Sequence, residues 1–345
     1  MENEAQKAQE SFLDFEKEAE KISKNAFSRM GFGFAALLSV WYVFHLFTMA
    51  ILETFWPFLL RENWVVLLVN DVSLYGIAFF VFWFVIRKMP ALAPRRFSLV
   101  PKNIGASVLM AYGLLVAGNL IGKIVSVVFD LAAGTKTVST VSSVVDGNGN
   151  FYIVFFLMAA VAPVMEELIF RRLMMNRLRR YGRWTAILVS SLLFACMHGN
   201  LIQVFYAFLL GLLLGYIYER SGKLRYTLLV HILINAYSTL LVYVTGNLSS
   251  LKGLPLREIF SFVLNSDAGT LLRIAVTVLM ILGEYVMAAF GIAFLIKRRK
   301  CFWLPSAGKQ HSFSETGFLS AVFTPGMLTA FAVTVVIFVI PYVIR

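Results

Sequence analysis

The chain has 345 residues, of which 59% are hydrophobic and only 14% are charged, and its formal net charge is +12. The apolar residues lie in long blocks, which is typical of a polytopic membrane protein and argues against a water-soluble domain. Because the bases lie in short clusters between these blocks, as orientation signals do, nucleic acid is not expected as a partner. Two distant cysteines, Cys196 and Cys301, indicate neither a disulfide framework nor a cysteine-rich metal site.

The N-terminal segment, residues 1–29, is strongly charged, and we expect it to be a cytoplasmic tail. Apolar side chains recur in it at helical spacing, at Phe12, Phe15, Ala19, Ile22 and Ala26. This pattern predicts an amphipathic helix on the membrane surface, with a solvated or partly disordered tail as the alternative.

The rest of the chain predicts an all-α fold, a polytopic membrane bundle of about eight to nine transmembrane helices. The apolar spans lie near 30–54, 64–87, 104–130, 151–170, 184–198, 201–219, 226–246, 271–296 and 325–344. They divide into N-terminal helices within 30–150, a central segment at 151–246 and C-terminal helices within 247–345. The Ser/Thr/Gly-rich residues 135–150 predict an exposed outer loop.

Basic residues predict how the bundle is oriented. On one side of the membrane the connections between spans are rich in Lys and Arg, and on the other side they contain only scattered bases such as Arg61. The basic connections are the tail, RKMPALAPRR, the cluster from Arg171 to Arg183, ERSGKLR, and KRRK at 297–300. This contrast places the basic connections, and the N-terminus, in the cytoplasm. The membrane would be the plasma membrane in a bacterium and the endoplasmic reticulum in a eukaryote.

The block from Trp184 to His198 is short for a membrane span. At 1.5 Å per residue it covers roughly 22 Å, less than the roughly 30 Å hydrocarbon core. We therefore expect this helix to end inside the membrane, with Gly199-Asn200 as its terminator.

Ionisable side chains within membrane spans are costly and are therefore functional candidates. The ionisable residues within the spans are His45, Asp71, Lys123, Glu166, Glu167, His198, His231 and Glu284. Asn235 is a polar residue in the same span as His231. For Asp71, Lys123 and Glu284 we favour interhelical pairing, and a proton relay in a transporter is the alternative. We expect His45 to be interfacial or packed, and the remaining candidates gather in consecutive spans of the central segment.

The adjacent carboxylates Glu166 and Glu167 point about 100° apart on a helix and cannot both face one cavity squarely. Glu167 stands four residues before Arg171, the favourable orientation for an intrahelical ion pair, so we interpret these two as structural. Glu166 is then free to face the bundle interior. The alternative to a functional role is that Glu166 is simply a buried carboxyl, either protonated or paired with a residue of another span.

The sequences FACMH and HILIN each place two residues on one helical face by a four-residue step. Together with Glu166, the residues His198, His231 and Asn235 supply a carboxylate base, two imidazoles and an amide donor. Hydrolysis of a peptide bond by activated water needs such a base and donors for the developing oxyanion.

Three stretches of the central segment resemble, in order, the EExxxR, FxxxH and HxxxN motifs of the CPBP family. They are EELIFR at 166–171, FACMH at 194–198 and HILIN at 231–235. The CPBP family, also called Abi, comprises CAAX prenyl proteases and bacteriocin-processing enzymes. The resemblance implies that 151–246 is the catalytic core of an intramembrane endopeptidase. By the same resemblance Glu166 and His198 activate water, His231 and Asn235 form the oxyanion hole, and Glu167 and Arg171 give structural support.

Zinc is the alternative to a metal-free mechanism, since Glu166, His198 and His231 are an adequate set of zinc ligands. No HExxH sequence is present, and a zinc ion on these three would leave no carboxylate as base, so we favour a mechanism without a cofactor.

The leading hypothesis is an endopeptidase acting on a membrane-associated peptide or protein, with a prenylated CAAX tail as one candidate, and with membrane lipids as its other partners. The alternative is a membrane scaffold or immunity protein that binds peptide or lipid without cleaving it. Residues alone decide neither the substrate nor the source.

Overall fold

The computed structural model describes residues 2–94, 101–134, 150–246, 251, 253–302 and 316–343, and every regular element within them is helical. Seven helical stretches are long and apolar enough to cross a membrane, and two shorter apolar helices, Arg183–Met197 and Pro325–Val339, accompany them. They match the nine predicted spans one for one, which confirms the polytopic helical bundle. The predicted outer loop lies almost wholly outside the described residues.

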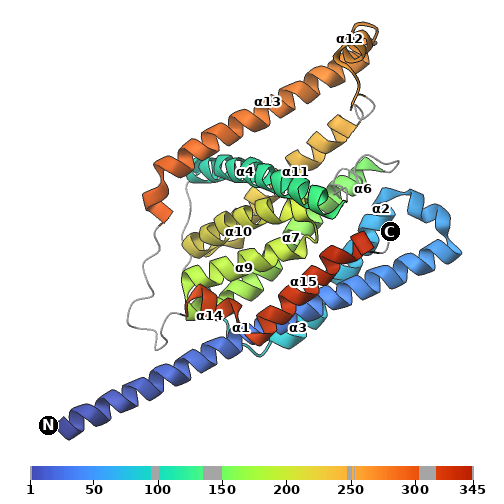
Figure 1. The fold of residues 1–345 in the computed structure, drawn as a ribbon. Helices are drawn as coiled ribbons and strands as arrows, with labels where there is room; N and C mark the ends of the chain where they lie inside the picture. Colours follow the sequence, from blue (N-terminus) through green and yellow to red (C-terminus); the bar gives the residue numbers. More distant parts are fainter. Residues whose placement is uncertain are drawn as a thin grey trace.

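The elements follow one another along the chain as shown in Figure 1. The N-terminal part contains α1 (Glu2–Phe55), η1 (Pro57–Arg61), α2 (Asn63–Asp71), η2 (Val72–Ala78), α3 (Phe79–Ile86) and α4 (Pro101–Ala133). The central part contains α6 (Phe151–Phe156), η3 (Leu157–Val161), α7 (Ala162–Glu167), η4 (Leu168–Met175), α8 (Asn176–Leu178), η5 (Arg179–Tyr181), α9 (Arg183–Met197), α10 (Leu201–Ser221) and α11 (Leu224–Gly246). The C-terminal part contains α12 (Leu256–Leu264), α13 (Ala268–Lys297), η7 (Arg299–Phe302), α14 (Phe318–Val322) and α15 (Pro325–Val343).

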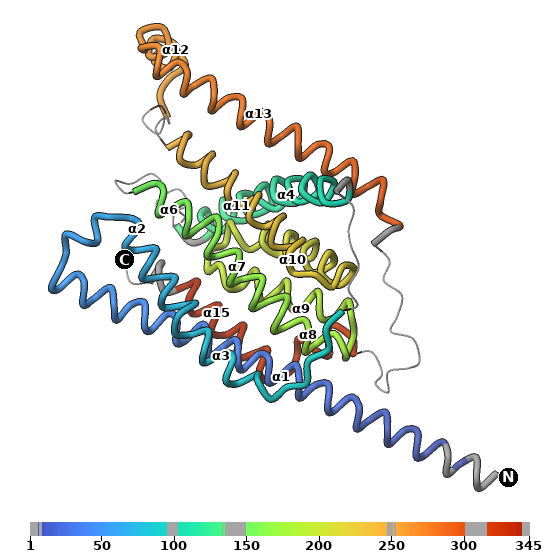
Figure 2. The backbone as a smooth tube through the Cα atoms, turned by 180° about the vertical axis from the view of Figure 1, so that it is seen from behind, coloured from blue at the N-terminus to red at the C-terminus, as the bar shows by residue number. Residues whose placement is uncertain are grey.

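Helix α1 continues without a break through the predicted tail and the first span. Its N-terminal part projects beyond the other helices in Figures 1 and 2. Ala19 and Ala26 are buried against the protein, whereas Phe12 and Phe15 are exposed. The tail is thus helical, as its spacing predicts, and it runs on into the first span, because no proline separates the two. Its place on the membrane surface stays a prediction.

The two ends of the sequence pack together through glycine. A Cβ added at Gly31 of α1 would collide with the carbonyl carbon of Gly326 in α15, and one added at Gly326 would collide with the backbone carbonyl oxygen of Ser28. The Gly326 amide also donates to the Ser28 hydroxyl at 3.0 Å. Small residues let membrane helices approach this closely, so α1 and α15 form one wall of the bundle.

Helix α4 packs against α10 on one side and α13 on the other (Figures 1 and 2). A Cβ at Gly118 would collide with the Tyr206 Cα atom of α10, and one at Gly291 of α13 would collide with the Leu109 carbonyl oxygen of α4. Backbone contact at these glycines joins α4 to the central helix α10 and to the C-terminal helix α13.

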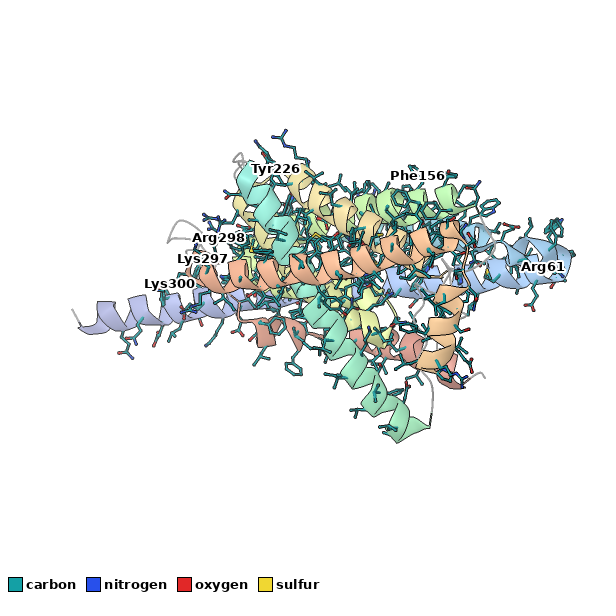
Figure 3. All side chains as sticks on the ribbon, turned by 90° about the horizontal axis from the view of Figure 1, so that it is seen from above. Arg61, Phe156, Tyr226, Lys297, Arg298 and Lys300 are labelled. Carbon is teal, nitrogen blue, oxygen red and sulfur yellow. The ribbon has the colours of Figure 1, made fainter. Side chains whose placement is uncertain are left out.

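The basic cluster at 297–300 lies at one end of the bundle. In Figure 3 Lys297, Arg298 and Lys300 lie towards the same end as Tyr226, and Arg61 lies at the opposite end. These labelled bases lie on opposite sides, as predicted for them. Which end faces the cytoplasm stays a prediction.

Helix α9 ends where its sequence predicts. Its last residue is Met197, Gly199 follows with a φ of 58°, and the Asn200 side chain accepts from the amides of Ile202 and Gln203 at the start of α10. Glycine reaches this left-handed conformation without steric cost, and asparagine satisfies amides that a helix start leaves free. The predicted terminator is confirmed.

We predict that Gly326→Ala lowers the free energy of unfolding by about 1–3 kcal/mol, since the added methyl group forces α1 and α15 apart. The matched control is Gly105→Ala in α4, where nothing lies within 4 Å of the new Cβ atom. Thermal unfolding in detergent, followed by tryptophan fluorescence, measures both variants. Equal midpoints for the two variants would contradict the close α1–α15 crossing.

Candidate active site

The two glutamates lie at the end of α7, between the two π-helical segments η3 and η4. The π-helical segment η2 carries Tyr75, which contacts Glu166. Short π-helical turns occur most often at functional sites, because the wider turn shifts the register of side chains and carbonyls. Among the described residues, the π-helical segment η2 contains the tyrosine that contacts Glu166, and η3 and η4 lie directly before and after the helix that contains Glu166.

Glu166 lies inside the bundle with 8% of its surface exposed. The Tyr75 hydroxyl donates to its Oε1 atom at 3.1 Å, and His231 Nε2 of α11 lies 3.4 Å from its Oε2 atom. Each carboxylate oxygen thus contacts a different helix. Glu166 is consequently held by groups that come from outside its own helix.

Glu167 is fully buried and contacts both a base and a cation. Its Oε1 atom lies 3.1 Å from His231 Nδ1, and its Oε2 atom lies 3.4 Å from Arg171 Nε. The predicted pairing with Arg171 is therefore present. The expectation that Glu167 points away from the partners of Glu166 is wrong, because the two nitrogens of one imidazole reach both carboxylates.

Arg171 is also fully buried. Its guanidinium donates to the Ser190 hydroxyl at 3.4 Å and lies 5.3 Å from the centre of the Phe194 ring. The contact between Arg171 Nε and Glu167 is an ion pair by distance, but it is not aligned as a hydrogen bond, and Arg171 Nη2 has no hydrogen-bond partner within the described part of the chain. The cation therefore compensates Glu167 mainly through charge and ring contact.

His198 lies beside this cluster rather than in direct contact with Glu166. Its Nδ1 atom lies 2.9 Å from the Phe194 carbonyl oxygen, and its ring packs edge-on against the Phe194 ring, with 4.8 Å between centroids. A carbonyl only accepts hydrogen bonds, so this contact assigns the proton of a neutral His198 to Nδ1 and leaves Nε2 as an acceptor. The Phe194 ring also contacts the His231 ring, with 5.8 Å between centroids, so both imidazoles pack against the same phenyl ring.

Asn235 follows His231 by one turn of α11, and its amide donates to the Met158 carbonyl at 3.1 Å. Met158 belongs to the π-helical segment η3. A primary amide has two N–H donors, so the contact leaves a second one. The structure thus gathers Glu166, Glu167, Arg171 and His231 into one cluster, with His198 packed against Phe194 and Asn235 bonded to Met158 rather than to its members.

Asp71, Lys123 and Glu284 were expected to form interhelical pairs. Glu284 of α13 lies within electrostatic reach of Lys123 in α4, as expected. Asp71 instead accepts from its neighbour Asn70 at 3.3 Å, and Asn70 accepts from Trp41 of α1 at 3.1 Å. The interhelical pairing expected for Asp71 is thus indirect, since hydrogen bonds through Asn70 connect it to α1.

The three residues proposed as zinc ligands do not fit a single ion in this arrangement. Among the described residues, no group of three or more His, Cys, Asp or Glu side chains is arranged to hold a metal ion. His231 contacts a carboxylate through each ring nitrogen, and the Phe194 ring packs edge-on against each of the two imidazoles. We therefore assign no step to a metal.

Tyr75 is the residue that the sequence analysis missed. It is buried, it lies 91 positions before Glu166, and it belongs to none of the motifs. In the sequence, Tyr75 is distinguished only by its position four residues after Asp71 within an apolar block.

Comparison with known proteins supports the same segment. Residues 148–237 match the family model described as type II CAAX prenyl endopeptidase Rce1-like. The chain is also 22% identical over 140 residues to the "Putative membrane peptidase YdiL" of Bacillus subtilis (strain 168), an alignment that covers 39% of this chain and 56% of that relative. The chain therefore spans little more than half the length of that relative. No solved structure matches it.

The helical fold and the match to the family model together define the class of protein, which is a polytopic helical membrane protein with a CAAX-endopeptidase-like core. The matched segment contains EELIFR, FACMH and HILIN, and the resemblance to the CPBP family of membrane proteases is thereby confirmed over residues 148–237.

We predict that Arg171→Met destabilises the protein by about 3–5 kcal/mol, because it leaves Glu167 buried without its cation. The double variant Arg171→Met with Glu167→Gln should recover part of this loss, since it removes both charges. Thermal unfolding in lipid nanodiscs measures the effect, with Arg172→Met, at an exposed neighbour, as the matched control. Equal stability of the Arg171 and Arg172 variants would show that this buried ion pair is not needed.

Proposed function

We propose that the chain is an intramembrane endopeptidase in which Glu166 acts as the general base on a water molecule. The observation that carries the proposal is the position of Glu166, which is buried in the matched segment with one oxygen at the Tyr75 hydroxyl and the other at His231 Nε2. A carboxylate held in this way can receive a proton from water and pass it to the leaving amine.

The charges of the cluster favour this chemistry. Glu166 and Glu167 bring two negative charges and Arg171 brings one positive charge, so one further proton makes the cluster neutral. A neutral cluster avoids the large cost of a net charge in a low-dielectric interior. His231 Nε2 lies 3.4 Å from Glu166 Oε2, within ion-pair distance of that carboxylate.

The flanking residues fit the remaining steps. His198 offers Nε2 as an acceptor for a water molecule that could bridge to Glu166. Asn235 has a second amide proton for the developing oxyanion, and a protonated His231 would stabilise the same negative charge. The roles implied by the CPBP resemblance are thus retained, with the change that His231 contacts Glu166 directly.

The proposed substrate is a membrane-associated peptide or protein, and a prenylated CAAX tail is the first candidate because the matched family model is that of a prenyl endopeptidase. Such tails lie at the cytoplasmic surface, which suits the predicted orientation with a cytoplasmic N-terminus. Membrane lipids are the other proposed partners.

We predict that Glu166→Gln lowers cleavage of a quenched peptide with a farnesylated CAAX terminus at least about 100-fold, since the base is removed. The control is Glu284→Gln, which neutralises another carboxyl within a span, near Lys123. This control should cleave like the wild type. Full activity of the Glu166→Gln protein would overturn the proposed function.

A wild type that binds the farnesylated peptide without cleaving it would instead support the non-catalytic scaffold. A transporter would be indicated if solute uptake responded to Glu284→Gln as strongly as to Glu166→Gln.

We also predict that cleavage survives removal of metal ions, because every step is assigned to side chains. Purified protein treated with 1,10-phenanthroline and EDTA should keep its rate of peptide cleavage after dialysis. Loss of the rate, followed by recovery on adding zinc alone, would contradict the metal-free mechanism.

A further inference from the structure

Tyr75 belongs to the N-terminal helices, outside the matched residues 148–237, yet it contacts the proposed base. Its side chain is 9% exposed, and its hydroxyl lies 3.1 Å from Glu166 Oε1. We propose that Tyr75 is a positioning residue for Glu166, so that the active site is completed by the stretch α2–η2. This inference rests on the proposed function.

Geometry supports the assignment first. A glutamate side chain has three rotatable bonds, and a single contact at one oxygen leaves its carboxyl plane free to turn. The bond from Tyr75 at Oε1 and the contact of His231 at Oε2 come from different helices, η2 and α11. Two contacts at opposite oxygens fix the plane, as a group that must receive a proton from a positioned water requires.

The chemistry of the donor supports it next. A phenol can donate a hydrogen bond to a carboxylate without adding a charge. Hydrogen bonds to charged groups are about twice as strong as those between neutral groups, and more so where water is excluded. Tyr75 can therefore hold Glu166 in place and leave the charge balance of the cluster unchanged.

The stretch that carries Tyr75 is itself fixed. Asp71, at the end of α2 and four residues before Tyr75, accepts from Asn70, which accepts from Trp41 of α1. Asp71 is 8% exposed and, like Tyr75, lies within electrostatic reach of Glu166. Hydrogen bonds thus connect α1 through α2–η2 to Glu166, and the tyrosine has a rigid support.

The test is Tyr75→Phe, which removes one hydroxyl and keeps the ring. We expect kcat for the farnesylated CAAX peptide to fall about 10- to 100-fold with KM unchanged, the loss expected for one hydrogen bond to a charged group. The matched control is Tyr218→Phe, since Tyr218 is also buried and its hydroxyl donates to Asn176 at the same 3.1 Å. That control should lose similar thermal stability and keep its kcat.

A second variant, Glu166→Asp, tests whether Tyr75 acts through Glu166. The shorter carboxylate cannot reach both partners, so Tyr75→Phe should lower kcat much less in this background than in the wild type. Equal losses in the two backgrounds, or a kcat of Tyr75→Phe equal to that of Tyr218→Phe, would overturn the positioning role.

A structure of the Tyr75→Phe protein in nanodiscs separates this proposal from the proposed function. Movement of the Glu166 carboxylate away from His231 would support positioning even if the farnesylated peptide proved not to be a substrate. An unmoved carboxylate would overturn it, whatever the wild type cleaves.

Discussion

His231 joins two adjacent carboxylates, and the central arrangement of this protein depends on that contact. Its Nδ1 atom meets Glu167 at 3.1 Å and its Nε2 atom meets Glu166 at 3.4 Å. Two neighbouring acids could not remain buried side by side without such a partner, because like charges repel strongly in a low-dielectric interior. The imidazole gives each acid its own nitrogen, and Arg171 then adds a cation on the far side of Glu167. Helices α7 and α11 are thereby held together at this depth.

The backbone around Glu166 is adapted to the same contact. Segments η3 and η4 bracket α7, and the Met158 carbonyl in η3 accepts from the Asn235 amide of α11. A membrane interior offers no water for free polar groups, so shifted carbonyls must find side-chain donors within the protein. The π-helical turns and the polar residues of α11 therefore depend on each other.

Local features of the sequence were sufficient to predict much of this. The nine apolar helices follow from block length, and the end of α9 follows from Gly199-Asn200, since both depend on neighbouring residues. The Glu167–Arg171 pair follows from their four-residue spacing. The sequence analysis overestimated how far apart the carboxylates of Glu166 and Glu167 lie. The 100° rotation between neighbouring residues of a helix sets the direction of each Cα–Cβ bond, but it does not fix where the end of a long side chain lies. Tyr75 could not be predicted, as a contact over 91 positions has no local pattern.

The contact from Tyr75 also extends the cluster around Glu166 beyond the matched segment. Residues 148–237 match a family model, but that segment alone leaves Glu166 Oε1 without the donor that it has in the whole bundle. In water a solvent molecule would replace the missing donor, whereas in a membrane interior the replacement must come from the protein itself. The N-terminal helices are therefore needed for more than insertion into the membrane, since the hydrogen bonds from Trp41 through Asn70 to Asp71 hold the helix that delivers Tyr75. On this argument the matched segment and the helices before it form a single functional unit, although only one of them has recognisable motifs.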